Sequence, residues 1–381
     1  MPESAISRRT FLAAAGLSVA ALGCGIDTIV TGTPTVPAPP SASPFLNGPY
    51  QVAKLILGED VTTVLPQPLD MRQYPDLPPN VHAAVYYPYT TATDHRVPTT
   101  DPFSLNGGHI PLGPFPLLLY AHAYRDPAGT LGTPPPARDF TSVEIMLEHV
   151  ASYGCVAIAP DLSWLLDGAD AAANWDRRAT VLVAYYQFLL STLNYVLFEN
   201  QVDPSRVILV GHSRGGGGAT HAGRMLLASS SPPRTLAFGL IAPEYGGDTG
   251  PDTQNLVVLG GTLDIDEGAE PQLAFMRAGT PKTWVTIQGA NHYGYTSICP
   301  ADNSCDSVRL FDENGTISRA AQQLTGASYL AALLRYYALG DGTALPYLNG
   351  QQPVQGLEVL NVSGITIQQQ GLPTPLPPVH P

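Results

Sequence analysis

Charged side chains, and basic ones above all, are scarce in this sequence. Only 13% of its 381 residues are charged, and 18 lysines and arginines stand against 31 aspartates and glutamates, for a formal net charge of −13. A chain of that sign repels polyanions, which argues against nucleic-acid partners. Hydrophobic residues make up 44% of the chain, which excludes a disordered protein and predicts a compact one with a buried core.

Long apolar runs are also missing. The run at residues 13–23 is too short to span a bilayer, which takes about 20 residues. It follows Arg8 and Arg9, and this arrangement predicts a twin-arginine export signal over residues 1–24. The alternative is a chance arginine pair before a buried helix. We therefore expect an exported protein that is periplasmic, secreted or held at the cell envelope.

The chain has only four cysteines. Cys24 ends a short segment that resembles the box before a lipidated cysteine, so a lipid anchor there and cleavage to a secreted protein both stay open. That anchor would be the only membrane contact. Cys155 lies in an apolar strand pattern and is expected to be a buried core residue. Cys299 and Cys305 predict a local disulfide in an exported protein, with a metal site as the weaker alternative.

The order of elements predicts one α/β domain. Residues 25–46 form a linker rich in proline, threonine and serine, residues 47–340 the domain, and residues 341–381 a peripheral tail rich in proline and glutamine. Short apolar runs read as strands at residues 81–88, 116–121, 155–159, 206–210, 236–242, 256–259 and 283–287. Helical patterns lie between them and after them, at 141–153, 171–198, 216–229, 272–277 and 327–339. This alternation predicts a mostly parallel central sheet with helices on both faces.

The motif Gly211-His212-Ser213-Arg214-Gly215 lies between an expected strand and an expected helix. That is the context of a nucleophile elbow, a tight turn that exposes a serine hydroxyl above the sheet. The turn needs small residues at 211 and 215, because side chains there would collide with the neighbouring strand or helix. Ser213 is therefore our candidate nucleophile, the alternative being an idle serine in a glycine-rich turn.

A serine hydroxyl needs a base, and chain order selects His292, which follows the expected strand 283–287. Asp264 follows strand 256–259, so serine, aspartate and histidine occur in the order that this kind of site uses. Asp266 and Glu267 stay open as rivals for the acid. The same four residues, 264–267, could instead form a solvated acidic loop or a weak calcium site.

Two backbone N–H groups are needed to hold an oxyanion. One is expected from Arg214, directly after the nucleophile, and the other from Tyr124 in the loop after strand 116–121, with Ala123 as the alternative. Trp164 follows the strand that ends at Asp161, where it could line a substrate pocket or simply pack in the core.

These motifs carry a family resemblance. The elbow with Gly216, the preceding Asp203-Pro204-Ser205-Arg206 and the segment Gly289-Ala290-Asn291-His292 resemble the chlorophyllase and polyester-hydrolase (cutinase-like) branch of the α/β-hydrolases, and platelet-activating-factor acetylhydrolases are similar in the same way. The resemblance covers roughly residues 81–339. It implies an esterase that needs no metal or cofactor, with Ser213, Asp264 and His292 as the triad and with Tyr124 and Arg214 as oxyanion donors. Tyr245 lies near the position where polyester-hydrolysing members carry an aromatic residue, and is a candidate wall residue.

The sequence thus predicts an exported, monomeric carboxylic-ester hydrolase that acts through an acyl-enzyme on short-chain or aromatic esters. An acyltransferase or a peptidase on the same triad is an alternative within enzymes. A non-catalytic surface lipoprotein that keeps the fold for binding is the alternative from another class.

Overall fold

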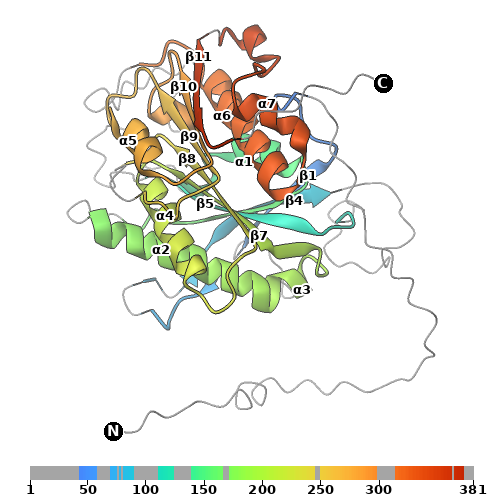
Figure 1. Ribbon diagram of the computed structural model, residues 1–381. Helices are drawn as coiled ribbons and strands as arrows, with labels where there is room; N and C mark the ends of the chain where they lie inside the picture. Colours follow the sequence, from blue (N-terminus) through green and yellow to red (C-terminus); the bar gives the residue numbers. More distant parts are fainter. Residues whose placement is uncertain are drawn as a thin grey trace, which may run out of the picture. The chain divides into compact units, whose positions relative to one another are not determined.

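The structure is a computed structural model of the chain (Figure 1). It describes residues 43–57, 69–74, 77–78, 80–89, 110–123, 139–165, 171–244, 249–297, 314–362 and 364–372, all within the compact unit Thr35–Pro381. Several predicted features lie outside the described residues: the signal segment with Cys24, the site residues Tyr124 and Tyr245, and the pair Cys299 and Cys305.

A nine-stranded sheet forms the centre of the described part, in the order β1-β4-β6-β5-β7-β8-β9-β10-β11. The strands are β1 (Gln51–Leu57), β4 (Ala83–Tyr89), β5 (Phe115–Ala121), β6 (Val156–Pro160), β7 (Val202–His212), β8 (Thr235–Ile241), β9 (Leu256–Gly261), β10 (Lys282–Ile287) and β11 (Ile365–Gln370). From β6 to β10 all neighbours are parallel, whereas β1, β4 and β11 pair antiparallel. The predicted fold class is confirmed. A separate short pair joins β2 (Leu69–Asp70) to β3 (Asn80–Val81).

Helices cover both faces of the sheet because its central strands are apolar on both sides. In β5 every residue is buried: Leu117 and Leu119 belong to one core, and Leu118 and Tyr120 to the other. The first core packs under α2 (Ala171–Phe188), α4 (Arg214–Leu227) and α5 (Glu270–Arg277), and the second under α1 (Glu144–Ala151), α6 (Arg319–Leu333) and α7 (Leu345–Leu348). The short helix α3 (Asn194–Val196) follows α2. Among the described helices none combines the length and apolar character needed to cross a membrane.

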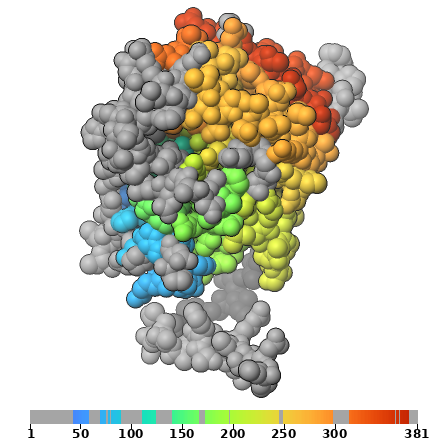
Figure 2. Space-filling model, turned by 90° about the vertical axis from the view of Figure 1, so that its left-hand side faces the viewer, coloured from blue at the N-terminus to red at the C-terminus, as the bar shows by residue number. Residues whose placement is uncertain are grey.

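The segment after Leu339 differs from the peripheral tail expected from its composition. β11 completes one edge of the sheet against β10, and Leu345, Leu348 and Leu357 are buried in the core beside α6. Figure 2 shows these C-terminal residues, in red, adjoining the residues of β9 and β10, in orange. The physical reason is that β10 would otherwise present an open edge, while the spaced leucines supply a buried face between the polar residues.

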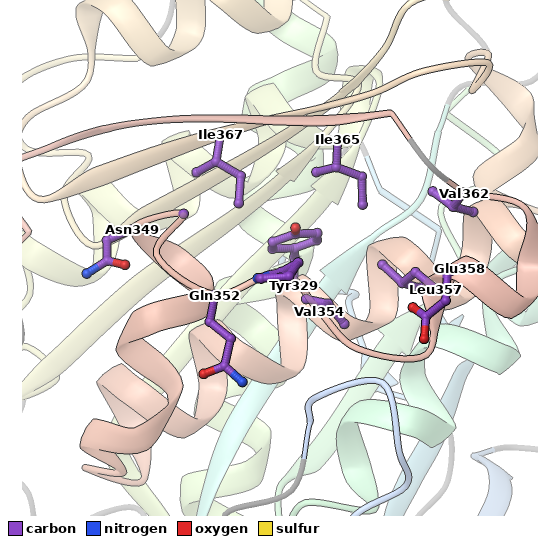
Figure 3. Close-up of a pocket in the computed structure, with 11 residues that line it drawn as sticks. Tyr329, Asn349, Gln352, Val354, Leu357, Glu358, Val362, Ile365 and Ile367 are labelled. Atoms are coloured by element: carbon purple, nitrogen blue, oxygen red, sulfur yellow. The ribbon is translucent and has the colours of Figure 1, made fainter. Parts of the chain in front are cut away.

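A cavity of about 420 Å³ lies where this segment meets α6. In Figure 3 the ring of Tyr329 stands in its centre, with Ile365 and Ile367 of β11 on one side and Val354 and Leu357 on the other. Its lining combines apolar side chains with the polar side chains of Asn349, Gln352 and Glu358. Gln352 donates to the Tyr347 hydroxyl, and Glu358 accepts from the backbone N–H of Gly356. None of the predicted site residues within the described part of the chain lines this cavity, which lies between α6 and the C-terminal strand.

A buried ion pair ties this segment to the domain and carries a stability prediction. The Arg335 side chain is fully buried, its Nε and Nη2 donate to Oδ2 of Asp341 at 2.7 Å, and Nη2 also donates to Thr343. Asp341→Asn leaves the guanidinium charge buried without its counter-ion and is expected to cost about 3–5 kcal/mol in urea unfolding. Asp70→Asn, which breaks a solvent-exposed pair with Arg72, should leave the midpoint unchanged. Equal midpoints for both variants would contradict this prediction.

Candidate active site

The parallel strands bring the predicted site residues to one edge of the sheet. Ser213 follows β7, Asp264 follows β9, His292 follows β10, and His122 with Ala123 follows β5. Carboxyl ends of parallel strands share an edge, and in open α/β sheets this edge is where ligands bind. Residues from four separate parts of the sequence therefore converge there.

Ser213 occupies a strained turn between β7 and α4. Its backbone has φ 55° and ψ −127°, a conformation that side-chain-bearing residues rarely adopt. A Cβ on Gly211 would lie 2.1 Å from the carbonyl oxygen of Gly215, and one on Gly215 would lie 2.1 Å from that of Ala121. Both contacts are with backbone, which cannot give way, so the steric requirement expected for these two glycines is confirmed.

Gly217 and Gly218 allow α2 to pack closely against α4. A Cβ on Gly217 or on Gly218 would lie 2.6 Å from Trp175 and from Arg178, respectively. Arg178 is fully buried, and it donates to the carbonyl oxygen of His122 at 2.6 Å and to Asn174 at 2.7 Å. It therefore fixes the loop after β5. Sequence reasoning missed Arg178, although an arginine in an apolar helix that precedes a run of four glycines is a usable signal.

The His122 side chain also holds the loop after β5 in place. Its Nε2 accepts from the N–H of Leu162 at 2.8 Å, so its proton is on Nδ1, which donates to the carbonyl oxygen of Ala123 at 2.8 Å. The loop that is expected to supply an oxyanion donor is thus anchored on both sides as far as Ala123.

His292 and Asp264 form a buried pair. The His292 Nδ1 lies 3.3 Å from both carboxylate oxygens of Asp264, and the two side chains are 0% and 1% exposed. Asn291, the residue before His292, is held by Gln322 of α6, whose amide accepts from its N–H at 3.2 Å and donates to its carbonyl oxygen at 2.6 Å. The imidazole is therefore fixed by its own loop as well as by the carboxylate.

The charges around His292 favour its protonated form. Burial lowers the pKa of His292, but the carboxylate of Asp264, with further contributions from Asp266 and Glu267, outweighs burial and raises the pKa to about 10. His212 stacks beside it at a ring separation of 4.9 Å. Burial, together with the charge on His292, holds the pKa of His212 well below its usual range, so His212 stays neutral.

Glu267 contacts the candidate nucleophile directly. The hydroxyl of Ser213 donates to Oε1 of Glu267 at 3.3 Å. The backbone N–H of Glu267 donates in turn to Oδ1 of Asp264 at 3.1 Å, which holds the glutamate in place. Burial, reinforced by the charges of Glu244, Asp266 and Asp264 and opposed by His292, raises the pKa of Glu267 to about 8. Sequence reasoning considered Glu267 only as an alternative triad acid and did not predict its contact with Ser213.

Asp266 lies on the other side of the imidazole, with its Oδ2 3.6 Å from Nε2 of His292 and hydrogen-bonded to the Tyr293 hydroxyl at 3.2 Å. Burial raises the pKa of Asp266. Among the described residues, Asp266, Glu267 and His292 form a group whose ligand atoms lie within 4.8 Å of one another, close enough for a metal ion. A cation held there would have the imidazole of His292 as its single nitrogen ligand, beside the carboxylates of Asp266 and Glu267.

Three further residues singled out in the sequence, Arg214, Trp164 and Cys155, lie within the described part of the chain. Arg214 is the first residue of α4, with its N–H at the positive end of the helix, and its side chain forms a two-point ion pair with Glu244 at 2.7 and 2.8 Å. Trp164 is partly buried against the core and donates its Nε1–H to the carbonyl oxygen of Asp161 at 2.9 Å. Cys155 is buried in the core.

Comparison with known proteins finds a family model and several relatives that are similar to this chain. The family model for chlorophyllase matches residues 132–232, a span that holds the elbow and ends before Asp264 and His292. The chain is 28% identical to cutinase est1 of Thermobifida alba over 157 residues, which cover 40% of this chain and 49% of that protein. It is 26% identical to a cutinase of Thermobifida fusca (strain YX) over 156 residues, 40% of this chain and 48% of that protein.

The chain has the α/β-hydrolase fold. The chlorophyllase match and the cutinases together support the chlorophyllase and cutinase-like branch, as the motifs predicted. The match spans about half the length of these cutinases. The substrate class of this chain therefore depends on the residues of its own site.

Proposed function

We propose that this α/β-hydrolase is a serine carboxylic-ester hydrolase. The observation that carries the proposal is the meeting of three features at one sheet edge. They are a serine in a strained elbow, an imidazole in the loop after β10, and a buried carboxylate on the Nδ1 side of that imidazole. The cutinases among its relatives agree with an ester as substrate.

In the proposed mechanism Ser213 Oγ attacks the ester carbonyl carbon while His292 Nε2 takes its proton and passes it to the leaving alcohol. Asp264 accepts the Nδ1–H and stabilises the imidazolium; Asp266 lies beside Nε2 and is poorly placed for that role. The N–H groups of Arg214 and Tyr124 hold the oxyanion, and water then hydrolyses the acyl-enzyme. The chain's own residues supply each of these roles, so the mechanism uses no cofactor.

Export forms part of the proposal. Arg8 and Arg9 before the apolar run support the twin-arginine route, and Cys24 supports either a lipid anchor or release after cleavage. We propose small or polymeric esters, rather than nucleic acid, as the substrates, in keeping with the net charge of −13.

The test is a panel of p-nitrophenyl esters combined with labelling by a fluorophosphonate probe. We expect the folded chain to hydrolyse acetate and butyrate esters faster than palmitate, and to incorporate one probe molecule at Ser213. Heat-unfolded protein is the control for both readings. Cleavage of palmitate alone would contradict the short-chain preference, and a folded chain that neither cleaves nor labels would contradict the enzyme and favour a binding protein.

A further inference from the structure

The hydroxyl of a serine has one hydrogen to donate. In the structure Ser213 gives that hydrogen to Oε1 of Glu267, whereas attack on an ester requires it to go to Nε2 of His292. A carboxylate and an imidazole therefore act as two acceptors for one hydrogen. The position of Glu267 is fixed, because its backbone N–H donates to Asp264, the carboxylate that also holds His292.

We propose that Glu267 restrains the nucleophile: it competes with His292 for the hydroxyl hydrogen of Ser213, and once ionised its charge stabilises the protonated imidazole, so that the site gains activity only as His292 loses its proton. This inference rests on the proposed function. It adds to the triad a residue that touches a reacting atom and that opposes the reaction in the resting protein.

The charges facing Glu267 come from four places. Asp264 and Asp266 share its loop, and Tyr293 donates to Asp266. His292 follows β10. Glu244, which follows β8, is paired with Arg214 of α4 and still adds its negative charge to the site. His212, beside His292, is neutral. The local balance is therefore set by one imidazole among four carboxyl groups, one of which is paired with Arg214.

The sign of the pH effect follows from this balance. His292 can accept a proton only when it is neutral, and carboxylates nearby favour the charged form. Activity should thus rise with pH along an acid limb that belongs to the coupled group rather than to His292 alone. Taking away the charge at 267 should move this limb to lower pH and also weaken the hydrogen bond that holds the hydroxyl away from His292.

The decisive variants are Glu267→Gln and Asp266→Asn, compared by kcat/KM for p-nitrophenyl butyrate from about pH 6 to about pH 11.5, with the uncatalysed rate subtracted. For Glu267→Gln we expect the acid limb to move down by about one unit and the high-pH plateau to rise about three- to tenfold, the range that one hydrogen bond is worth. Asp266→Asn removes a charge near His292 while leaving the Ser213 contact in place, so it should move the limb without raising the plateau.

Glu199→Gln is the matched control, because Glu199 is exposed in the turn before β7, at the opposite end of the strand from Ser213. It should reproduce the wild-type profile. Glu267→Ala should show the same rise in the plateau. This second variant shows that the effect does not depend on the glutamine side chain. The rate of inactivation by the fluorophosphonate, which reports the nucleophile without deacylation, should rise in the same proportion in both Glu267 variants.

A Glu267→Gln profile that matches the wild type, or a plateau that is unchanged or lower in a variant with wild-type thermal stability, would overturn the inference. In that case the wild-type chain would still hydrolyse esters, and the proposed function would stand. Absence of turnover and of labelling in the wild type at every pH would overturn both.

Discussion

Ser213→Ala should lower the rate of ester hydrolysis by about 10⁴- to 10⁶-fold, close to the background of the uncatalysed reaction. The variant removes only the oxygen that attacks the carbonyl. The backbone of the elbow is held by the N–H of Ser213 on Ile241 and by the glycines around it, so the fold should survive. The measurement is kcat/KM for p-nitrophenyl butyrate, with circular dichroism to establish that the variant is folded.

Ser229→Ala serves as the control for this variant. Ser229 lies just beyond the far end of α4, where its hydroxyl donates to the carbonyl oxygen of Leu226, and its loss should leave kcat/KM unchanged. A Ser213→Ala protein within about tenfold of the wild-type rate would remove the serine mechanism altogether.

Asp264→Asn is expected to produce the second-largest loss, about 10⁴-fold in kcat. An amide at this position can donate to Nδ1 and so favours the tautomer with the proton on Nε2, where the hydroxyl proton of Ser213 has to go. The loss should be mainly in kcat, because Asp264 is buried behind the imidazole and has no contact with substrate in the mechanism.

Comparison with Asp266→Asn makes this test decisive between the two acids. Asp266 faces Nε2, so its conversion should cost at most about tenfold and should shift the pH profile instead. A reversal of the two losses would make Asp266 the triad acid, with a different imidazole orientation in the working enzyme.

The parts of the site that could be predicted from sequence are those that depend on local backbone. The elbow needs a strand, small residues and a helix start within a few positions, and all three can be read around Ser213. Asp264 and His292 could be selected because each follows a strand in the expected order. Chain order alone, however, does not show which face of the imidazole a carboxylate meets, so Asp266 and Glu267 stayed open.

The contacts that could not be predicted join distant segments. Arg178 reaches the carbonyl oxygen of His122 across 56 positions, and Glu267 reaches Ser213 across 54. Glu267 does not differ by its local pattern from an ordinary loop residue, and the signal for Arg178 appears only when its helix is considered together with the glycines at 215–218. β1 and β11 went unpredicted for a related reason, since antiparallel edge strands are half exposed and carry a weaker apolar signal than the buried strands between them.

The position of β11 in the chain affects how the sheet is completed during synthesis. The strand comes from the last part of the described chain, so during synthesis every other strand of the sheet is available before it. Until β11 docks, β10 presents unpaired backbone groups that can pair with the same edge of another copy. Chains cut short before Ile365 should therefore aggregate by pairing the edges of their sheets. A purification tag at the carboxyl end would select the molecules in which β11 has been synthesised.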